Sequence, residues 1–423
     1  MGWMETCAME ERMRFVLAVE AGEETMAALC RRFGVSRQNG YKWLARFREE
    51  GAPGLFDRSR APLTHAQEVE AGVAERCLAV RRAHPSWGPV KVRAFLMREE
   101  PDVRFPAASS IGDLFDRAGL TVKRRRRRRA TPTGILPFAP VTAANDVWAI
   151  DFKGWFRTGE GRRCDPLTLA DLDSRYLLRC QALAQTDTPH VWPLLYAAFR
   201  EFGLPKRLRS DNGPPFASVG AGGLSRLAVN VIKAGVGLER IEPGKPQQNG
   251  RLERLHLTLL NDTARPPAHS LRAQAERFQA FQRLYNEERP HQALNNDTPA
   301  EHYAPSPRAF DGVLREPHYA DDCEVRRVRS NGEIKWRGKL VQINGALAGE
   351  PVGLAEGADG AWRVFYGALE LGQIDRRGER LKRPRRRDRG LVDNAAALPT
   401  GSTERAATRD WNETGNVSPM SPV

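Results

Sequence analysis

Long apolar runs, paired cysteines and a secretory leader are all missing from this sequence. No stretch of about 18 consecutive apolar residues occurs, so we expect no transmembrane helix. The N-terminal MGWMETCAMEERMRF has early acidic residues and lacks the apolar core that begins a secretory signal. The six cysteines are scattered, with no C-x-x-C pair and no His/Cys cluster at zinc-ligand spacing. We therefore expect reduced thiols, no structural zinc, no contact with a membrane and a cytoplasmic location.

The chain is basic, and its charge is concentrated in two short segments. Hydrophobic residues make up 41% of the 423 residues, which is enough for several hydrophobic cores. The net charge is +14, and residues 123–129 and 376–389 each contribute +7, which together equal the whole excess. Runs of this kind repel themselves until a polyanion neutralises them. A nucleic acid is the expected partner, and a solvated tail or a localisation patch is the alternative.

Residues 1–60 are predicted to form a helix-turn-helix DNA-binding domain. Apolar residues recur at helical spacing on both sides of a tight turn at Gly34, and Ser36 is suited to cap the second helix. In such a unit the second helix enters a major groove. The side chains expected to face the core of this helix are Tyr41, Leu44 and Phe47. Those expected to face DNA are Arg37, Gln38, Asn39 and Lys42. An ordinary helical hairpin with a polar face is the alternative.

Residues 65–122 are predicted to form a second helical domain. Val73, Cys77 and Val80 share one helical face, and the chain then breaks at Pro85 and resumes as a helix. A second helix-turn-helix and a small three-helix packing domain fit these residues equally well. Residues 123–140 follow as a basic linker rich in proline and glycine. Its candidate DNA-binding side chains are Arg124, Arg125 and Arg126.

The remaining chain changes character twice. Residues 141–303 alternate strands and helices, which predicts an α/β domain with a mixed sheet and helices on its faces. Residues 319–375 contain short strands separated by glycine turns, which predicts a small antiparallel β-barrel. This barrel could bind DNA or mediate subunit contacts, and its residues do not decide between the two. Residues 376–423 lack a core and are expected to be a disordered basic tail.

Three acidic residues, Asp151, Asp211 and Glu253, are candidates for a functional site. Asp151 interrupts an apolar strand, where an unpaired acid is costly to bury. Asp211 lies in a Ser-Asp-Asn-Gly segment, and Glu253 lies in the first turns of a helix. Turn formation and the helix dipole are sufficient explanations for Asp211 and Glu253 taken singly. Together, three carboxylates can hold two hard divalent cations, and such a pair can clamp the attacking and leaving oxygens of a phosphodiester.

The sequence resembles bacterial insertion-sequence transposases that have a retroviral-integrase-like, ribonuclease-H-type catalytic core. The resemblance rests on segments IDFKG (150–154), TLADLDSRYLL (168–178), RSDNGPPFAS (209–218), PGKPQQNGRLERLHLTL (243–259), YNEERPHQAL (285–294) and TPAEHY (298–303). It implies that Asp151, Asp211 and Glu253 are an acidic triad that binds two Mg²⁺ ions, with Mn²⁺ as a substitute. It also implies that Asn249, one helical turn before Glu253, contacts the DNA end.

The sequence departs from this family pattern in two places. The spacing between Asp211 and Glu253 exceeds that usual in retroviral integrases, and the glycine-rich stretch 219–226 is the expected insertion. The zinc module of retroviral integrases is absent, and the helical N-terminal units are expected to replace it.

The resemblance therefore predicts a nucleoid-associated DNA transposase. Such an enzyme binds the terminal inverted repeats of its element, frees 3′-OH ends and joins them to target DNA, acting as a homodimer or larger homo-oligomer on double-stranded DNA. The alternatives are an inactive DNA-binding regulator and a nuclease of the ribonuclease H type. Asp171 and Asp173 are expected to serve a turn and His256 to lie on a helix surface. The expected role of the segment with Arg289 and His291 is packing, with possible reach of either residue to DNA.

Overall fold

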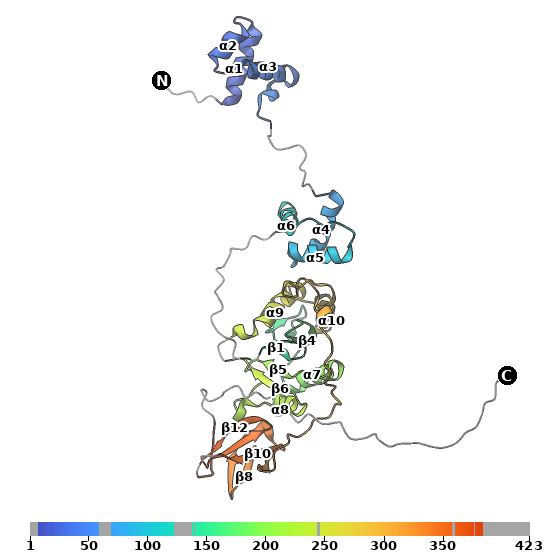
Figure 1. Cartoon of the computed structure of the whole chain (residues 1–423), viewed down its shortest axis with the longest axis vertical. Coiled ribbons are helices and arrows are strands. Elements are labelled where there is room, and N and C mark those ends of the chain that lie inside the picture. Colours follow the sequence, from blue (N-terminus) through green and yellow to red (C-terminus); the bar gives the residue numbers. More distant parts are fainter. Residues whose placement is uncertain are drawn as a thin grey trace, which may run out of the picture. The chain divides into compact units, whose positions relative to one another are not determined.

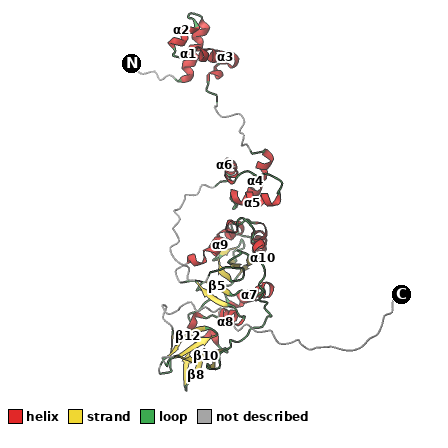
Figure 2. Ribbon diagram, viewed as in Figure 1, coloured by secondary structure: helices red, strands yellow, loops and turns green. Residues whose placement is uncertain are grey.

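The computed structural model describes residues 7–58, 69–121, 138, 140–242, 246–357, 360–375 and 377–383. It divides into two compact units, Met1–Glu70 and Ala71–Val423, which are described separately (Figures 1 and 2). The basic run 123–129, with Arg124, Arg125 and Arg126, lies outside the described residues, as does the segment 384–423. No helix in the described part of the chain combines the length and apolarity that a membrane span requires.

The first unit is a small helical domain. It consists of α1 (Ala8–Ala21), α2 (Met26–Arg32) and α3 (Arg37–Glu50), followed by a 3₁₀ turn at Ala52–Leu55. Ser36 caps α3, because its Oγ accepts a hydrogen bond from the Asn39 N–H at 3.3 Å. Gly34 supplies the left-handed backbone of the turn, with φ of 67°. The buried core consists of Phe15, Val16, Leu29, Cys30, Leu44 and Leu55. The predicted helix-turn-helix is confirmed.

One core assignment on α3 was wrong. Tyr41 is 57% exposed, whereas Gly40 is buried against Phe15 and Cys30. A Cβ atom on Gly40 would lie 2.8 Å from both of these side chains, so glycine permits the close approach of the helices. The packed face of α3 therefore passes through Gly40 and Leu44, and Tyr41 is turned about 100° away from it.

Three further helices open the second unit. They are α4 (Ala71–Ala83), α5 (Pro89–Glu99) and α6 (Ala108–Arg117). Trp87, in the turn before α5, is fully buried, and the His84 ring stacks on it at 4.0 Å. The predicted apolar face of α4 is present, because Val73 and Cys77 are both buried.

The centre of the second unit is a six-stranded mixed sheet. Its strands are β1 (Val147–Phe152), β2 (Phe156–Arg157), β3 (Arg163–Asp171), β4 (Leu177–Leu183), β5 (Arg207–Ser210) and β6 (Gly237–Arg240). The order is β2-β3-β1-β5-β6, with β4 also paired to β3. The pairs β1–β3 and β3–β4 are antiparallel, whereas β1–β5 and β5–β6 are parallel. The predicted mixed sheet is confirmed.

Helices cover both faces of this sheet. The elements are α7 (Thr188–Phe202), α8 (Arg226–Lys233), α9 (Gly250–Thr263), α10 (Leu271–Arg283) and the short α11 (Pro299–His302). Trp148 and Ile150 of β1 pack in the core formed with α7 and α8. Val147 and Ala149 pack in the core formed with α9 and α10. This alternation is the two-residue period of a strand buried on both sides.

The C-terminal part, orange in Figure 1, contains an antiparallel sheet. Its strand order is β13-β12-β11-β10-β7, and β8 and β9 form a separate hairpin. Its strands are β7 (Glu324–Arg327), β8 (Glu333–Trp336), β9 (Lys339–Gln342), β10 (Pro351–Glu356), β11 (Trp362–Tyr366), β12 (Leu369–Ile374) and β13 (Leu381–Lys382). Among the described strands, β13 and β7 are not paired with each other, so the predicted closed barrel is not confirmed.

The last strand corrects the predicted start of the tail. β13 lies inside the segment expected to lack structure, and Ile374 pairs with Leu381. The turn between them is closed by Asp375, whose Oδ1 accepts hydrogen bonds from the backbone N–H groups of Glu379 and Arg380. Leu381 also packs against the core of the C-terminal sheet. The many charged residues around Leu381 gave no indication of this packing in the sequence.

The glycine-rich insertion contacts this C-terminal sheet. Its 3₁₀ turn, Ala221–Gly223, places Ala221 in the same buried core as Leu371 of β12. The Asn344 Nδ2 donates to the carbonyl oxygens of Ala221 and Leu224 at 3.0 and 3.1 Å. The inserted residues therefore form part of the surface on which the C-terminal sheet packs.

Candidate active site

Asp151 lies near the end of the central strand β1, opposite Thr168 of β3. Its side chain is only 22% exposed. Burial, followed by the negative charge of Asp211, raises the pKa of Asp151 to about 7, and Glu253 adds to this rise. The three acids come from a strand, a loop and a helix, yet they are close enough to act on one another electrostatically.

Asp211 directly follows β5, the parallel neighbour of β1. Its Oδ1 accepts a hydrogen bond from the Gly213 N–H at 3.1 Å, which is the turn chemistry expected of Asp-Asn-Gly. The Asn212 Nδ2 donates to the Ile241 carbonyl at 2.5 Å and ties this loop to the end of β6. The loop therefore holds Asp211 at the same end of the sheet as Asp151.

Glu253 is exposed in the first turn of α9. The helix dipole favours an anion there, and the carboxylate makes no ion pair within the described part of the chain. Asn249, the N-cap residue of α9, is 4% exposed. Neither polar atom of its side chain has a hydrogen-bond partner among the residues described. A buried amide without a partner is costly, so this end of α9 has unused capacity to bind a polar ligand.

These residues fit a divalent metal site by their chemistry. Carboxylate oxygens are the donors that Mg²⁺ prefers, and the like charges that raise the Asp151 pKa would be offset by a cation. Across the described residues, no three His, Cys, Asp or Glu side chains already form a closed ligand cluster. The triad thus supplies suitable donors without a preassembled ligand shell, and the two-ion assignment stays a prediction.

His256 does not lie on the helix surface as expected. It is 3% exposed, and its Nε2 lies 2.7 Å from Thr168 Oγ1. Its Nδ1 lies 3.9 Å from Asp151 Oδ2. Burial, followed by the charge of Lys153, lowers the pKa of His256 to about 4, so the imidazole is neutral at pH 7. His256 is one turn after Glu253, and it joins the helix that carries the third acid to the strands that carry the first.

Three other residues considered from the sequence of this domain are Asp171, Arg289 and His291. Asp171 serves a turn as predicted, because its Oδ2 accepts hydrogen bonds from the backbone N–H and the hydroxyl of Ser174. Arg289 is 6% exposed and its Nη1 lies 3.5 Å from Asp262 Oδ2, which agrees with the expected packing role, whereas DNA contact by this residue stays a prediction. The His291 ring packs edge-on against Tyr285, which agrees with a packing role.

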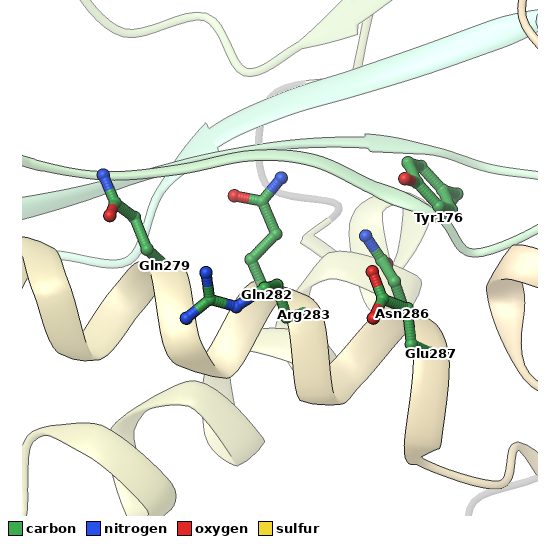
Figure 3. A pocket seen from close by; sticks show the side chains of 6 residues that line it. All are labelled: Tyr176, Gln279, Gln282, Arg283, Asn286 and Glu287. Carbon is green, nitrogen blue, oxygen red and sulfur yellow. The ribbon is translucent and has the colours of Figure 1, made fainter.

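A surface cavity of about 240 Å³ lies elsewhere on the same domain. The side chains of Gln282 and Asn286 point toward β4 in Figure 3. The Gln282 Nε2 donates to the carbonyl oxygens of Leu177 and Leu178 in that strand. The lining residues are Tyr176, Gln279, Gln282, Arg283, Asn286 and Glu287. None of the three acids lines this cavity, so it is not part of the candidate active site.

The predicted DNA-binding face of α3 is open to solvent. Arg37, Gln38, Asn39 and Lys42 are all exposed. Tyr41 also lies on this exposed face, although the sequence pattern was interpreted as placing it in the core. A helical wheel with 100° per residue and Gly40 on the packed face predicts the exposed position of Tyr41. DNA contact by these residues stays a prediction.

Four family models match the chain. They are a helix-turn-helix domain (residues 11–62), a homeodomain-like domain (39–115), an integrase core domain (234–299) and the IS481 family transposase C-terminal domain (323–382).

Two curated relatives are proteins of insertion elements. The IS407 uncharacterized 31.7 kDa protein of Burkholderia multivorans is 30% identical over 238 residues, which cover 56% of this chain and 81% of the relative. The IS476 uncharacterized 39.2 kDa protein of Xanthomonas euvesicatoria is 26% identical over 257 residues, which cover 60% of this chain and 71% of the relative.

Solved structures show a more distant likeness. A chain of the simian T-cell lymphotropic virus intasome is 15% identical, with a TM-score of 0.35, and the match covers 68% of this chain and 91% of that one. The HTLV-2 integrase catalytic core domain, in complex with magnesium, is 14% identical, with a TM-score of 0.28 and coverage of 38% and 95%. TM-scores this low support no argument about the site.

Proposed function

This chain belongs to the insertion-sequence transposases that have an integrase core, and we propose that it cleaves and joins DNA at the ends of its element. The observation that carries the proposal is that Asp151, near the end of β1, and Asp211, directly after β5, lie at the same end of two neighbouring parallel strands. Burial, the charge of Asp211 and that of Glu253 raise the pKa of the Asp151 carboxyl, and a perturbed carboxyl with acidic neighbours is typical of a functional site.

Asp151, Asp211 and Glu253 would hold two Mg²⁺ ions, and Mn²⁺ is the expected substitute. Bound metal supplies charge stabilisation for the attacking and leaving oxygens of an in-line phosphodiester displacement. The acids bind metal and are not nucleophiles. Asn249, the N-cap residue of α9, has no hydrogen-bond partner for its side chain among the described residues, and it would donate or accept a hydrogen bond at the DNA end.

The helical N-terminal units would recognise the terminal inverted repeats. The exposed side chains of α3, Arg37, Gln38, Asn39 and Lys42, are suited to base edges and phosphates in a major groove. Two element ends must be joined in one event, so we expect a dimer or larger homo-oligomer on double-stranded DNA.

The test is metal-dependent nicking of a duplex that carries the element's own terminal repeat. Asp151→Asn should abolish nicking in Mg²⁺ while leaving binding of the repeat intact. Asp173→Asn is the matched control, since Asp173 is an acid of the same domain in the turn after β3, and it should nick at the wild-type rate. Nicking by Asp151→Asn at the rate of the control would refute the assignment of the triad.

A further inference from the structure

Trp155 is an exposed aromatic residue beside the candidate active site. It lies between β1 and β2, four residues after Asp151, and it is 56% exposed. Every other tryptophan that the structure describes is buried or half-buried. The left-handed backbone of Gly154, with φ of 87°, turns the chain immediately before it. Exposure of so large an apolar surface at this position requires an explanation.

Two arginine side chains lie near the Trp155 ring. The guanidinium carbons of Arg157 and Arg163 lie 5.7 and 5.4 Å from its centroid, within the range of cation–π attraction. Arg163 forms a two-point ion pair with Asp165, at 2.6 and 2.9 Å. The Arg157 Nη1 donates to the Gly161 carbonyl at 2.8 Å. Arg163 is therefore oriented by its ion pair, whereas Arg157 has one hydrogen bond to the backbone.

The hairpin that carries this group is anchored at both ends. The Lys153 N–H donates to the Pro166 carbonyl at 3.0 Å. At the tip, the N–H groups of Gly159 and Glu160 donate to the carbonyl oxygens of Ala268 and His269, at 2.9 and 2.8 Å. Because these hydrogen bonds already order the hairpin, binding of a ligand to it costs little conformational entropy.

We propose that Trp155 stacks on an unpaired DNA base near the scissile phosphate, while Arg157 neutralises a flanking phosphate. This inference rests on the proposed function and names a binding subsite for it. The base must be unpaired because neighbouring pairs cover both of its faces in a duplex. Four residues span at most about 13 Å, and less where Gly154 turns the chain, so the base lies within roughly four nucleotides of the phosphate near Asp151.

The test compares two fluorescein-labelled duplexes by anisotropy, using the full chain. One is blunt, and the other has a single-stranded dT overhang of about four nucleotides at its 3′ end. The ratio of the two affinities cancels the contribution of the helix-turn-helix. Wild-type protein should prefer the overhang, and Trp155→Ala should reduce that preference by about 5- to 150-fold, which is the usual effect of losing one stacked base.

Four controls separate stacking from other roles of the ring. Trp155→Phe should retain most of the preference, and Val313→Ala, which removes another exposed apolar side chain, should retain all of it. An abasic nucleotide placed at each overhang position in turn should abolish the effect of Trp155→Ala at one position. Arg157→Ala should lower the slope of log affinity against log salt by about 0.7 on the overhang.

The outcomes are distinguishable. If Trp155→Ala keeps the wild-type preference, the stacking inference is wrong, even if Asp151→Asn is inactive and the proposed function stands. If Trp155→Ala loses only self-association, the ring packs against a second copy of the chain and the inference is again overturned. If Asp151→Asn still nicks DNA, the proposed function fails irrespective of the overhang preference.

Discussion

Substitution of Glu239 by Gln tests how the sheet supports the candidate active site. Glu239 of β6 accepts hydrogen bonds from two arginines of β5, Arg207 at 2.5 Å and Arg209 at 2.9 Å. The side chains of Glu239 and Arg209 are 8% and 7% exposed, and that of Arg207 is 17% exposed. The Glu239→Gln substitution removes the negative charge that faces the buried Arg209 and the half-buried Arg207, and it preserves the shape of the side chain.

The expected cost follows from this burial. Burial lowers the pKa of Arg209, and the charge of Glu239 opposes that effect. Breaking a buried pair leaves an uncompensated charge and costs about 3–5 kcal/mol. At about 2–4 °C of Tm per kcal/mol for a domain of this size, Tm should fall by roughly 6–20 °C. Arg209 is two residues before Asp211, so nicking should also decrease as β5 loosens.

Thermal unfolding of the full chain measures this effect. Glu276→Gln is the control, because its partner Arg272 and Glu276 itself have side chains that are 91% and 63% exposed. An exposed pair of this kind contributes about 0.5 kcal/mol or less. Equal decreases in Tm for the two variants would refute the argument that burial makes the Glu239 network important.

Three further predictions concern stability. Gly40→Ala should destabilise the helix-turn-helix by about 1–3 kcal/mol in a denaturant titration, because its Cβ would overlap two core side chains; an unchanged midpoint would contradict this. Hydrogen bonds from Lys206 and the adjacent backbone outweigh burial and lower the pKa of Asp146 to about 2. This depressed pKa stabilises the fold by about 2 kcal/mol above pH 4, and the stabilisation is lost as pH falls through 2. Stability curves of wild type and Asp146→Asn should therefore converge in acid, and a constant difference would be inconsistent with this reasoning. Lys233→Met should cost about 3–5 kcal/mol in urea, because it leaves the buried Glu350 carboxylate, 2.9 Å away, without its cation; no loss would show that the Tyr366 hydroxyl alone suffices.

Several local features could be predicted because neighbouring residues determine them. The N-cap at Ser36 and the turn at Gly34 follow from backbone chemistry within a few residues. The helical repeat of α3 was also evident, yet Tyr41 was assigned to the core. Periodicity gives the spacing of a face, whereas the position of the packed stripe depends on where a neighbouring helix crosses. At α3 that crossing is at Gly40, where only a missing side chain permits contact.

The burial of His256 could not be predicted from the residues around it in the sequence. A histidine three residues after a glutamate fits an exposed helix face, and only contact with Thr168 of β3 shows otherwise. The start of the predicted tail failed for the same reason. Leu381 stands among arginines and lysines, and its partner Ile374 becomes apparent only once the strands pair.

By itself, the sequence singled out Asp151, because an acid inside an apolar strand has no local partner. It also determined the order of helical units, mixed sheet and antiparallel sheet, since each depends on short-range periodicity. Only the tertiary structure decided that Asp211 and Glu253 act on Asp151, that His256 joins their elements, and that a glycine-rich insertion seats the C-terminal sheet. Those outcomes depend on the parallel pairing of β1 with β5 and on the packing of α9, which join segments far apart in the chain.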